Sequence, residues 1–166
     1  MNRIVRIALA GAAIVAASGA GAATATTTFL VTATVGANCL TTATAMAFGT
    51  YLPGNGVVNQ TSTVSVRCTS GTSYTVGLTP GLFTGATVTT RRMSNGGLPL
   101  AYSLYRDAGR TLNWGVTAGT DTLAGAGAGL ATIQNFTVYG QVPDSAPNQA
   151  ATVGSYTDTI TVNVVY

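Results

Sequence analysis

The sequence predicts an all-β fold of the sandwich or barrel class, and three observations lead to this prediction. Apolar and polar residues alternate in several short segments, as they do in strands with one buried face. The chain contains 21 glycines and 5 prolines, and turn-forming runs of these residues separate the segments. After residue 22 no stretch of ten or more residues has the 3.6-residue period of an amphipathic helix, and the helix formers Lys and Glu are absent.

Residues 1–22 have the features of a secretory signal peptide and are excluded from the expected fold. Arg3 and Arg6 form a basic start, the apolar run that follows is too short to span a bilayer, and "AGA" at 20–22 fits the small-x-small cleavage rule. An uncleaved anchor is the alternative. The mature chain would start near Ala23 and hold about 144 residues, which suits one domain with its own core.

The expected strands follow one another through most of the mature chain. In chain order they lie within 28–39, 48–56, 62–68, 73–81, 98–111, 133–143 and 154–166. The alternation places these residues inward: Phe29, Val31, Ala33, Val35, Val64, Val66, Cys68, Tyr74, Val76, Leu78, Leu100, Tyr102, Leu104, Phe136, Val138, Ile160, Val162, Val164 and Tyr166. Residues 115–131 and 143–154 are expected to be loops because they are rich in Gly and Ala or in polar turn formers.

Two cysteines, Cys39 and Cys68, remain in a chain that is expected to be exported. An even number of cysteines in an oxidising compartment predicts one disulfide. A metal pair is the rival interpretation, but two cysteines without any histidine are too few ligands for a metal site. We therefore expect a disulfide, no metal and no cofactor.

The sequence contains few residues that are suited to catalysis, so we expect no enzyme. It has no His, Lys or Glu, and Asp107, Asp144 and Asp158 are expected to be turn formers or solvated charges. Trp114 is expected to be a packing residue of the core or its rim. The glycines of 115–131 lack the Lys-Ser/Thr of a phosphate-binding loop. A mature net charge of +1 provides no basic patch for nucleic acid.

Several blocks of the mature chain resemble the spore coat protein U domain family, which includes the Csu-type (archaic) chaperone–usher pilus subunits. The blocks occur in the family's order and are "FGTY" (48–51), "SVRC" (65–68), "YSLYRDAGRTLNWG" (102–115), "VYGQVP" (138–143) and "GSYTDTITVNVVY" (154–166). The third and the last are the specific ones, and the cysteines lie where the family has its disulfide. The resemblance implies one domain over 23–166. It further implies an incomplete immunoglobulin-like β-sandwich that lacks its last strand and is completed by donor-strand addition from another molecule.

Such a fold needs an acceptor groove and a donor segment, and the alternation suggests where each lies. Ile160, Val162, Val164 and Tyr166 are expected to line the groove, since the final strand continues to the last residue. Residues 23–35 are the candidate donor, with Phe29, Val31, Ala33 and Val35 on its apolar face and no charged residue. The alternative is that this segment is an ordinary first strand of its own domain.

The resemblance implies a structural shaft subunit of a secreted surface pilus. The implied partners are a periplasmic chaperone, an outer-membrane usher and other copies of the chain in a linear polymer. The resemblance also implies export through the periplasm to a pilus on the cell surface. A secreted coat or matrix protein of the same fold is the second hypothesis. A carbohydrate-binding module that uses Trp114 and the tyrosines is the third.

Overall fold

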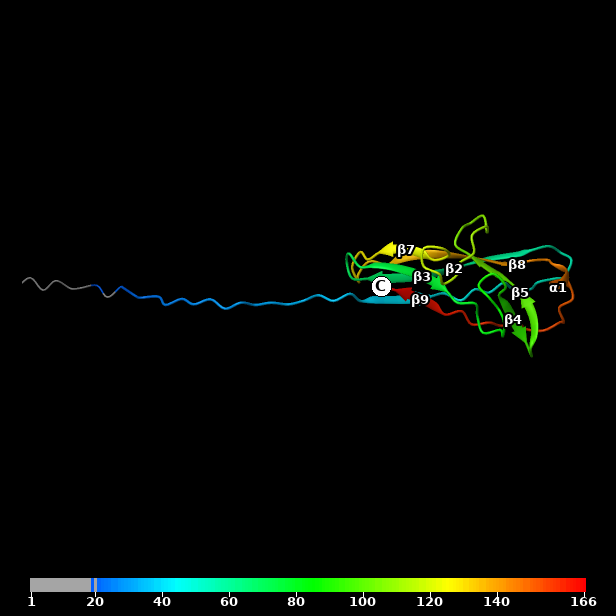
Figure 1. Cartoon of the computed structure of the whole chain (residues 1–166), viewed down its shortest axis with the longest axis horizontal. Helices are drawn as coiled ribbons and strands as arrows, with labels where there is room; N and C mark the ends of the chain where they lie inside the picture. The colour runs from blue at the N-terminus through cyan, green and yellow to red at the C-terminus, as the bar shows by residue number, and fades with distance from the viewer. Residues whose placement is uncertain (1–18, 20) are drawn as a thin grey trace, which may run out of the picture. The chain divides into compact units, whose positions relative to one another are not determined.

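The computed structural model of the protein describes residue 19 and residues 21–166. The predicted signal peptide falls largely outside these residues and stays a prediction. The chain divides into two units, Met1–Thr34 and Val35–Tyr166. Figure 1 shows the second unit as a body of strands. In chain order its elements are β1 (Cys39–Ala43), β2 (Val58–Cys68), β3 (Ser73–Leu78), β4 (Arg92–Asn95), β5 (Leu98–Ala101), β6 (Ser103–Tyr105), β7 (Leu123–Ala126), β8 (Gln134–Val142), α1 (Ala146–Gln149) and β9 (Val162–Val165).

The strands form two main antiparallel sheets and one small hairpin. The first sheet has the order β1-β2-β8-β6, and the second has the order β7-β3-β9. The hairpin pairs β4 with β5 and is joined to the chain before β9 by a bridge between Ser94 and Thr157. The predicted all-β class is confirmed. The two open sheets enclose one core, as in an immunoglobulin-like sandwich.

The core is built by the alternation of β2, β3, β8 and the 98–105 region. Val64, Val66 and Cys68 are buried while Ser65 and Arg67 between them are more exposed, which confirms the inward face predicted for β2. Burial of one such Val or Leu side chain contributes about 1.5–3 kcal/mol. The buried apolar residues are Val64, Val66, Cys68, Tyr74, Val76, Leu78, Leu100, Tyr102, Leu104, Trp114, Val138 and Val142.

Three local expectations differ from the structure. The expected loop 115–131 contains β7, which pairs with β3, and the loop 143–154 contains the single helical turn α1, with Pro147 in its first turn. Residues 48–56 form no strand, although the predicted turn is present at Pro53 and Gly54. For β7, pairing with the distant strand β3, which local pattern does not report, decided the outcome.

Residues 21–34 of the first unit have no regular secondary structure, and their side chains are exposed. The strand that was expected within 28–39 therefore exists only from Cys39 onward. A strand requires a hydrogen-bonding partner, and the first pairing that the described residues show is Cys39 with Cys68.

Candidate functional site: an open apolar groove

The last strand, β9, lies at the edge of its sheet and pairs only with β3 in the described part of the chain. Thr161 and Asn163 face β3, since Thr79 N donates to Thr161 O over 3.1 Å and Asn163 is the register partner of Gly77. Successive residues of a strand direct their backbone groups to opposite sides. The N–H and C=O groups of Ile160, Val162 and Val164 therefore face the open edge, where another strand can pair.

Two cavities lie beside this edge, between the chain that follows β1 and the chain that leads into β9. The first has a volume of about 400 Å³, and Ala43–Met46 and Tyr156–Ile160 form parts of its walls. The second, of about 640 Å³, lies between 46–53 and 151–156. Because Met46, Phe48, Met93 and Tyr156 line both, the cavities form one continuous depression, which we name the acceptor groove.

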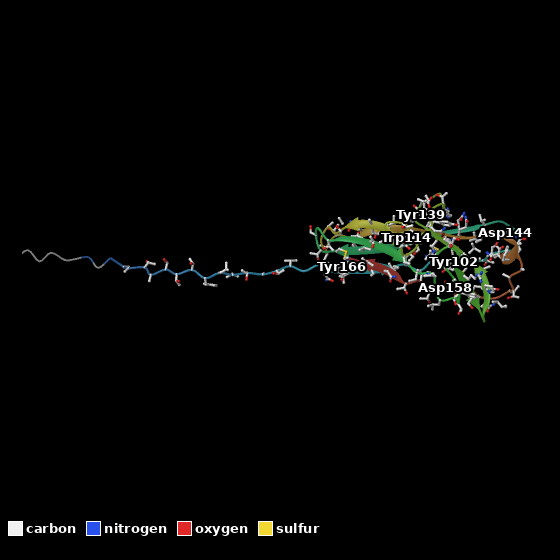
Figure 2. The ribbon with its side chains drawn as sticks, viewed as in Figure 1. Tyr102, Trp114, Tyr139, Asp144, Asp158 and Tyr166 are labelled. Atoms are coloured by element: carbon white, nitrogen blue, oxygen red, sulfur yellow. A yellow bond between two sulfur atoms is a disulfide. The ribbon has the colours of Figure 1, made fainter. Side chains whose placement is uncertain are left out.

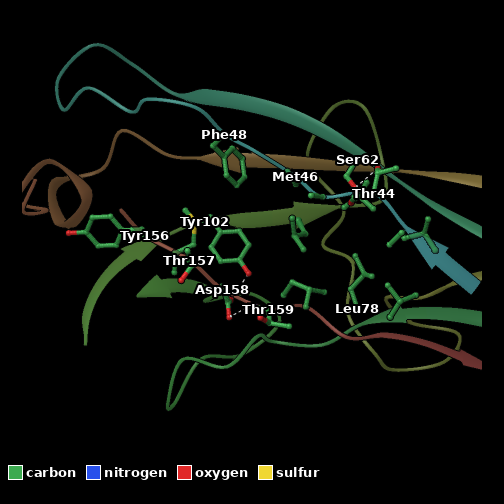
Figure 3. Close-up of a pocket in the computed structure, with 18 residues that line it drawn as sticks. Thr44, Met46, Phe48, Ser62, Leu78, Tyr102, Tyr156, Thr157, Asp158 and Thr159 are labelled. Atoms are coloured by element: carbon green, nitrogen blue, oxygen red, sulfur yellow. Dashed lines mark hydrogen bonds between the residues drawn. The ribbon is translucent and has the colours of Figure 1, made fainter. Parts of the chain in front are cut away.

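Figure 3 shows Met46 and Phe48 on one wall of the first cavity and Tyr156 to Thr159 on the opposite wall. Deeper lining residues come from the core, among them Val64, Leu78 and Leu104. The groove thus opens directly onto the apolar interior. A strand that entered it would replace water on the core side and pair with β9 at its edge.

The structure places the predicted groove residues unequally. Ile160 and Val162 line the first cavity, and both are partly buried against the core, as is Val164. Tyr166 follows the end of β9, is 57% exposed and lies outside the cavity lining, near the end of the body in Figure 2. The inward alternation also extends further back than predicted, to Tyr156 and Asp158.

Asp158 is the polar residue of the groove wall that sequence reasoning interpreted as a solvated charge. Its carboxylate accepts hydrogen bonds from Tyr102 Oη at 2.6 Å, from Leu82 N at 2.8 Å and from Thr159 N at 2.7 Å. Burial, followed by the bond to Asp158, raises the pKa of Tyr102 well above its usual range. The carboxylate therefore ties this wall of the groove to the core residue Tyr102 and to the loop that follows β3.

Behind this wall the guanidinium of Arg91 is completely buried. It donates to four carbonyl oxygens, and burial lowers its pKa. The acceptors are Leu78 O, Thr79 O, Val88 O and Trp114 O, at 2.6–2.9 Å. The four carbonyls in turn satisfy N–H groups of a guanidinium that is removed from water. Arg91 therefore holds together the backbone segments that support the floor of the groove.

The opposite wall is anchored by Asp144, which was predicted to be a turn residue. Its Oδ1 accepts from Tyr51 Oη at 2.6 Å and from Gly54 N at 3.0 Å, and its Oδ2 accepts from Gly56 N at 2.9 Å. The bond from Tyr51, followed by those from the two amides, lowers the pKa of Asp144 to about 2. We name this set the Asp144 clasp; it holds residues 51–56, part of the wall of the second cavity.

Asp107 is the aspartate that behaves as predicted. Its carboxylate accepts from Leu112 N at 2.8 Å and from Thr111 N and Oγ1, closing the turn after β6. These bonds, with that from Leu112 N the largest, lower its pKa.

The predicted disulfide between Cys39 and Cys68 is present, with an S–S distance of 1.99 Å. The two residues are register partners at the start of β1 and the end of β2. The bond therefore fixes the point at which the N-terminal segment joins the sandwich.

The candidate donor residues lie in the exposed N-terminal part of the chain. Phe29 is 85% exposed, Val31 77% and Val35 83%, and Ala33 is exposed as well. Leu30, on the other face of the segment, is 87% exposed. The apolar side chains of this segment therefore make no contact with a core.

The structure removes the basis for a sugar site at Trp114. Its side chain has no exposed surface, and its indole Nε1 donates to Val76 O at 2.8 Å. Figure 2 places it within the sandwich. A sugar must stack on an accessible ring face, so the packing interpretation of Trp114 is the correct one.

Within the described residues, no three His, Cys, Asp or Glu side chains lie close enough together to hold a metal ion. No helix among them has the length and apolar character that a membrane crossing requires.

The comparison with protein families matches residues 25–163 to the Spore Coat Protein U domain. The chain belongs to this family. Among its relatives is "Protein U" of Myxococcus xanthus, which is 37% identical over 133 residues that cover 72% of this chain and 70% of that protein. The Spore Coat Protein U domain thus extends over the sandwich and most of the candidate donor segment.

The fold of this domain is also found in a solved structure from Acinetobacter baumannii. That structure is the CsuC–CsuE chaperone–tip adhesion subunit pre-assembly complex of archaic chaperone–usher Csu pili. The TM-score is 0.58 and the sequence identity is 25%. The match covers 80% of this chain and 41% of the matched chain, so our protein spans about two fifths of its length.

Proposed function

We propose that this protein is a shaft subunit of a secreted surface pilus and that it polymerises by donor-strand exchange. Residues 23–35 of one copy occupy the acceptor groove of the next and pair with the open edge of β9. The observation that carries the proposal is the coincidence of an apolar groove beside an edge strand with an exposed, uncharged segment of alternating apolar residues.

The lengths of donor and groove agree. The thirteen residues 23–35 would extend about 43 Å as a strand at about 3.3 Å per residue. The groove and β9 together present a similar number of residues, from Ala151 to Val164. The side chains of the donor carry no charge, so they enter the groove without the cost of desolvating an ion.

The positions of the strand ends support a linear polymer. β1 starts at Cys39 beside Cys68, and β9 ends at Val165 beside Thr75. Figure 1 marks the C-terminus, which follows β9, at one end of the sandwich, and the cyan strand β1 lies at the same end. A donor that runs antiparallel to β9 would reach the groove from the opposite end. The donor end of one copy would thus contact the opposite end of the next copy. Such head-to-tail contacts extend into a fibre instead of closing into a dimer.

The likeness to a chaperone-bound subunit supports a periplasmic chaperone as the partner that protects the groove before assembly. An outer-membrane usher would then export the polymer to the cell surface. The similarity to Protein U favours a second candidate function, a secreted coat or matrix protein that uses the same groove. Co-expression with a chaperone and usher separates the two, because only the pilus hypothesis predicts fibres in electron micrographs that depend on both partners.

The direct test removes the donor. A variant that lacks residues 23–30 is expected to bind chaperone and to cap a fibre, but not to extend one. Its matched control is a self-complemented variant, in which 23–30 are deleted and residues 23–35 are fused after Tyr166 through a flexible linker. This control is expected to be a stable monomer. Long polymers formed by the deletion variant alone would refute donor-strand exchange through this segment.

A further inference from the structure

The two methionines beyond the predicted signal peptide, Met46 and Met93, both lie in the acceptor groove. They come from distant parts of the chain, since Met46 follows β1 and Met93 lies in β4. Each lines both cavities, so the pair marks the point where the cavities join.

Both side chains are half-buried and reach toward the interior. Met46 lies over Gly140 of β8, where an added Cβ would collide with its Sδ and with the ring of Phe48. The missing side chain at Gly140 therefore creates the space that this thioether fills. Both cysteines are joined in the disulfide, and no free cysteine occurs among the described residues. The thioethers are thus the oxidisable sulfur atoms of the open groove.

We propose that Met46 and Met93 form an oxidation site that controls whether the acceptor groove can take up a strand; the proposal rests on the function proposed above. The oxidant is a peroxide. Its O–O bond breaks as an S–O bond forms, one oxygen atom is transferred to the thioether sulfur, and the peroxide is reduced to water. The sulfur loses two electrons and becomes a sulfoxide.

The consequence follows from where the new oxygen atom is placed. A sulfoxide is polar, and in an open groove water can hydrate it. A donor strand would strip that water away and press the S=O group against apolar walls such as Phe48 and Leu104, which cannot replace the hydration that it loses. A strand that is already seated covers both sulfur atoms instead. The groove is therefore sensitive to peroxide before assembly and protected after it.

The test uses the variant that lacks residues 23–30, which cannot fill the groove of another copy, and a fluorescent peptide of residues 23–35. Peptide uptake is timed before and after treatment with hydrogen peroxide, and mass spectrometry counts the oxygen atoms added at each methionine. We expect both methionines to be oxidised and uptake to slow by about tenfold or more. In the self-complemented variant we expect oxidation itself to slow by a similar factor, because the fused strand covers the sulfur atoms.

Two variants identify the groove as the cause. The uptake rate of the double variant Met46→Leu/Met93→Leu is measured before and after peroxide treatment. The two rates should agree within about twofold. Adding Leu112→Met to that background restores an oxidisable side chain at a position that is 49% exposed and outside the groove lining. Oxidation there should leave uptake equally unaffected.

The outcomes separate this inference from the function on which it rests. If the untreated chain takes up no peptide, the proposed function fails, and this inference fails with it. If the untreated chain takes up peptide and the fully oxidised chain does so within about twofold of the same rate, only the oxidation site is refuted. Equal oxidation rates in the open and self-complemented proteins would refute the protection by a seated strand.

Discussion

Val162 and Val165 lie on one strand and face in opposite directions. Val162 lines the first cavity, whereas Val165 is 67% exposed. A carboxylate at position 162 would lie against apolar walls, and burial of an unpaired charge costs several kcal/mol. We expect Val162→Asp to lower the free energy of unfolding by that amount and to prevent donor-peptide uptake. Urea unfolding and peptide binding measure the two effects.

The matched control is Val165→Asp, which adds the same charge on the outer face. We expect its free energy of unfolding to change by less than about 0.5 kcal/mol. Equal losses in the two variants would mean that β9 does not present one face to a groove.

The Asp144 clasp predicts a specific dependence of stability on pH. The folded pKa of Asp144 is lowered to about 2, so its contribution is present above the ordinary Asp pKa and is lost as the pH falls through about 2. Burial and the bond to Asp144 raise the pKa of Tyr51 to about 12, so its contribution is present below pH 10 and is lost as the pH rises through about 12. The clasp should therefore stabilise the protein between about pH 4 and 10.

Asp144→Asn replaces one acceptor oxygen with an N–H₂ donor that faces other donors. The Tm of this variant should lie below that of the wild type near pH 7, and the gap should narrow as the pH falls from 4 to 2. Tyr51→Phe keeps the two bonds from backbone amides, so its Tm at pH 7 should lie closer to that of the wild type. A Tm difference between Asp144→Asn and the wild type that stays constant down to pH 2 would contradict the titration of Asp144.

Gly81 connects the end of β3 to the groove wall. Its φ is +96°, and a Cβ there would collide with the carboxylate of Asp158. Gly97, in the β4–β5 turn, has a φ of +91° and open space around its Cβ position. Gly97→Ala therefore introduces backbone strain alone, about 1–3 kcal/mol. Gly81→Ala introduces the same strain and also displaces Asp158.

We expect Gly81→Ala to be the more destabilising of the two in denaturant unfolding. It alone should alter donor-peptide uptake, because Asp158 lies in the groove lining. Identical unfolding curves for the two variants would show that the position of Asp158 does not contribute to stability.

The comparison of sequence and structure shows which elements can be predicted from local pattern. β2 and β3 could be predicted because their alternation is carried by neighbouring residues such as Val64 and Val66. β7 could not be, because three of its four residues are Ala or Gly, and the place of its glycine depends on a distant ring. Gly125 is the register partner of Tyr74, and a Cβ on Gly125 would collide with the Tyr74 ring. The glycine that suggested a loop is thus the residue that lets this strand pair.

The candidate site shows the same division. Ile160 and Val162 could be assigned from alternation alone. The bonds of Asp158 and Asp144 could not be, because their partners Tyr102 and Tyr51 lie 56 and 93 residues away in the sequence. A carboxylate in a turn-rich segment resembles any solvated turn former until the fold brings a phenol to it.

A filled groove should raise the stability of the entire sandwich. In the self-complemented variant, burial of Phe29 and Val31 contributes about 1.5–3 kcal/mol for each side chain. Since about 1 kcal/mol shifts the Tm of a domain of this size by about 2–4 °C, we expect calorimetry to show a rise of at least about 6 °C. The control fuses a Gly/Ser peptide of the same length. An equal rise in that control would show that the linker, rather than the seated strand, is responsible.

The disulfide has a mechanical consequence in the proposed fibre. Tension along the fibre would reach each subunit through the peptide that enters β1 at Cys39, the residue whose sulfur is bonded to Cys68. The load therefore passes at once into β2, the eleven-residue strand that pairs along most of its length with β8. β1 alone, with five residues, would be peeled away one hydrogen bond at a time. The covalent bond instead makes the pull act along the long strands, where many hydrogen bonds must break together.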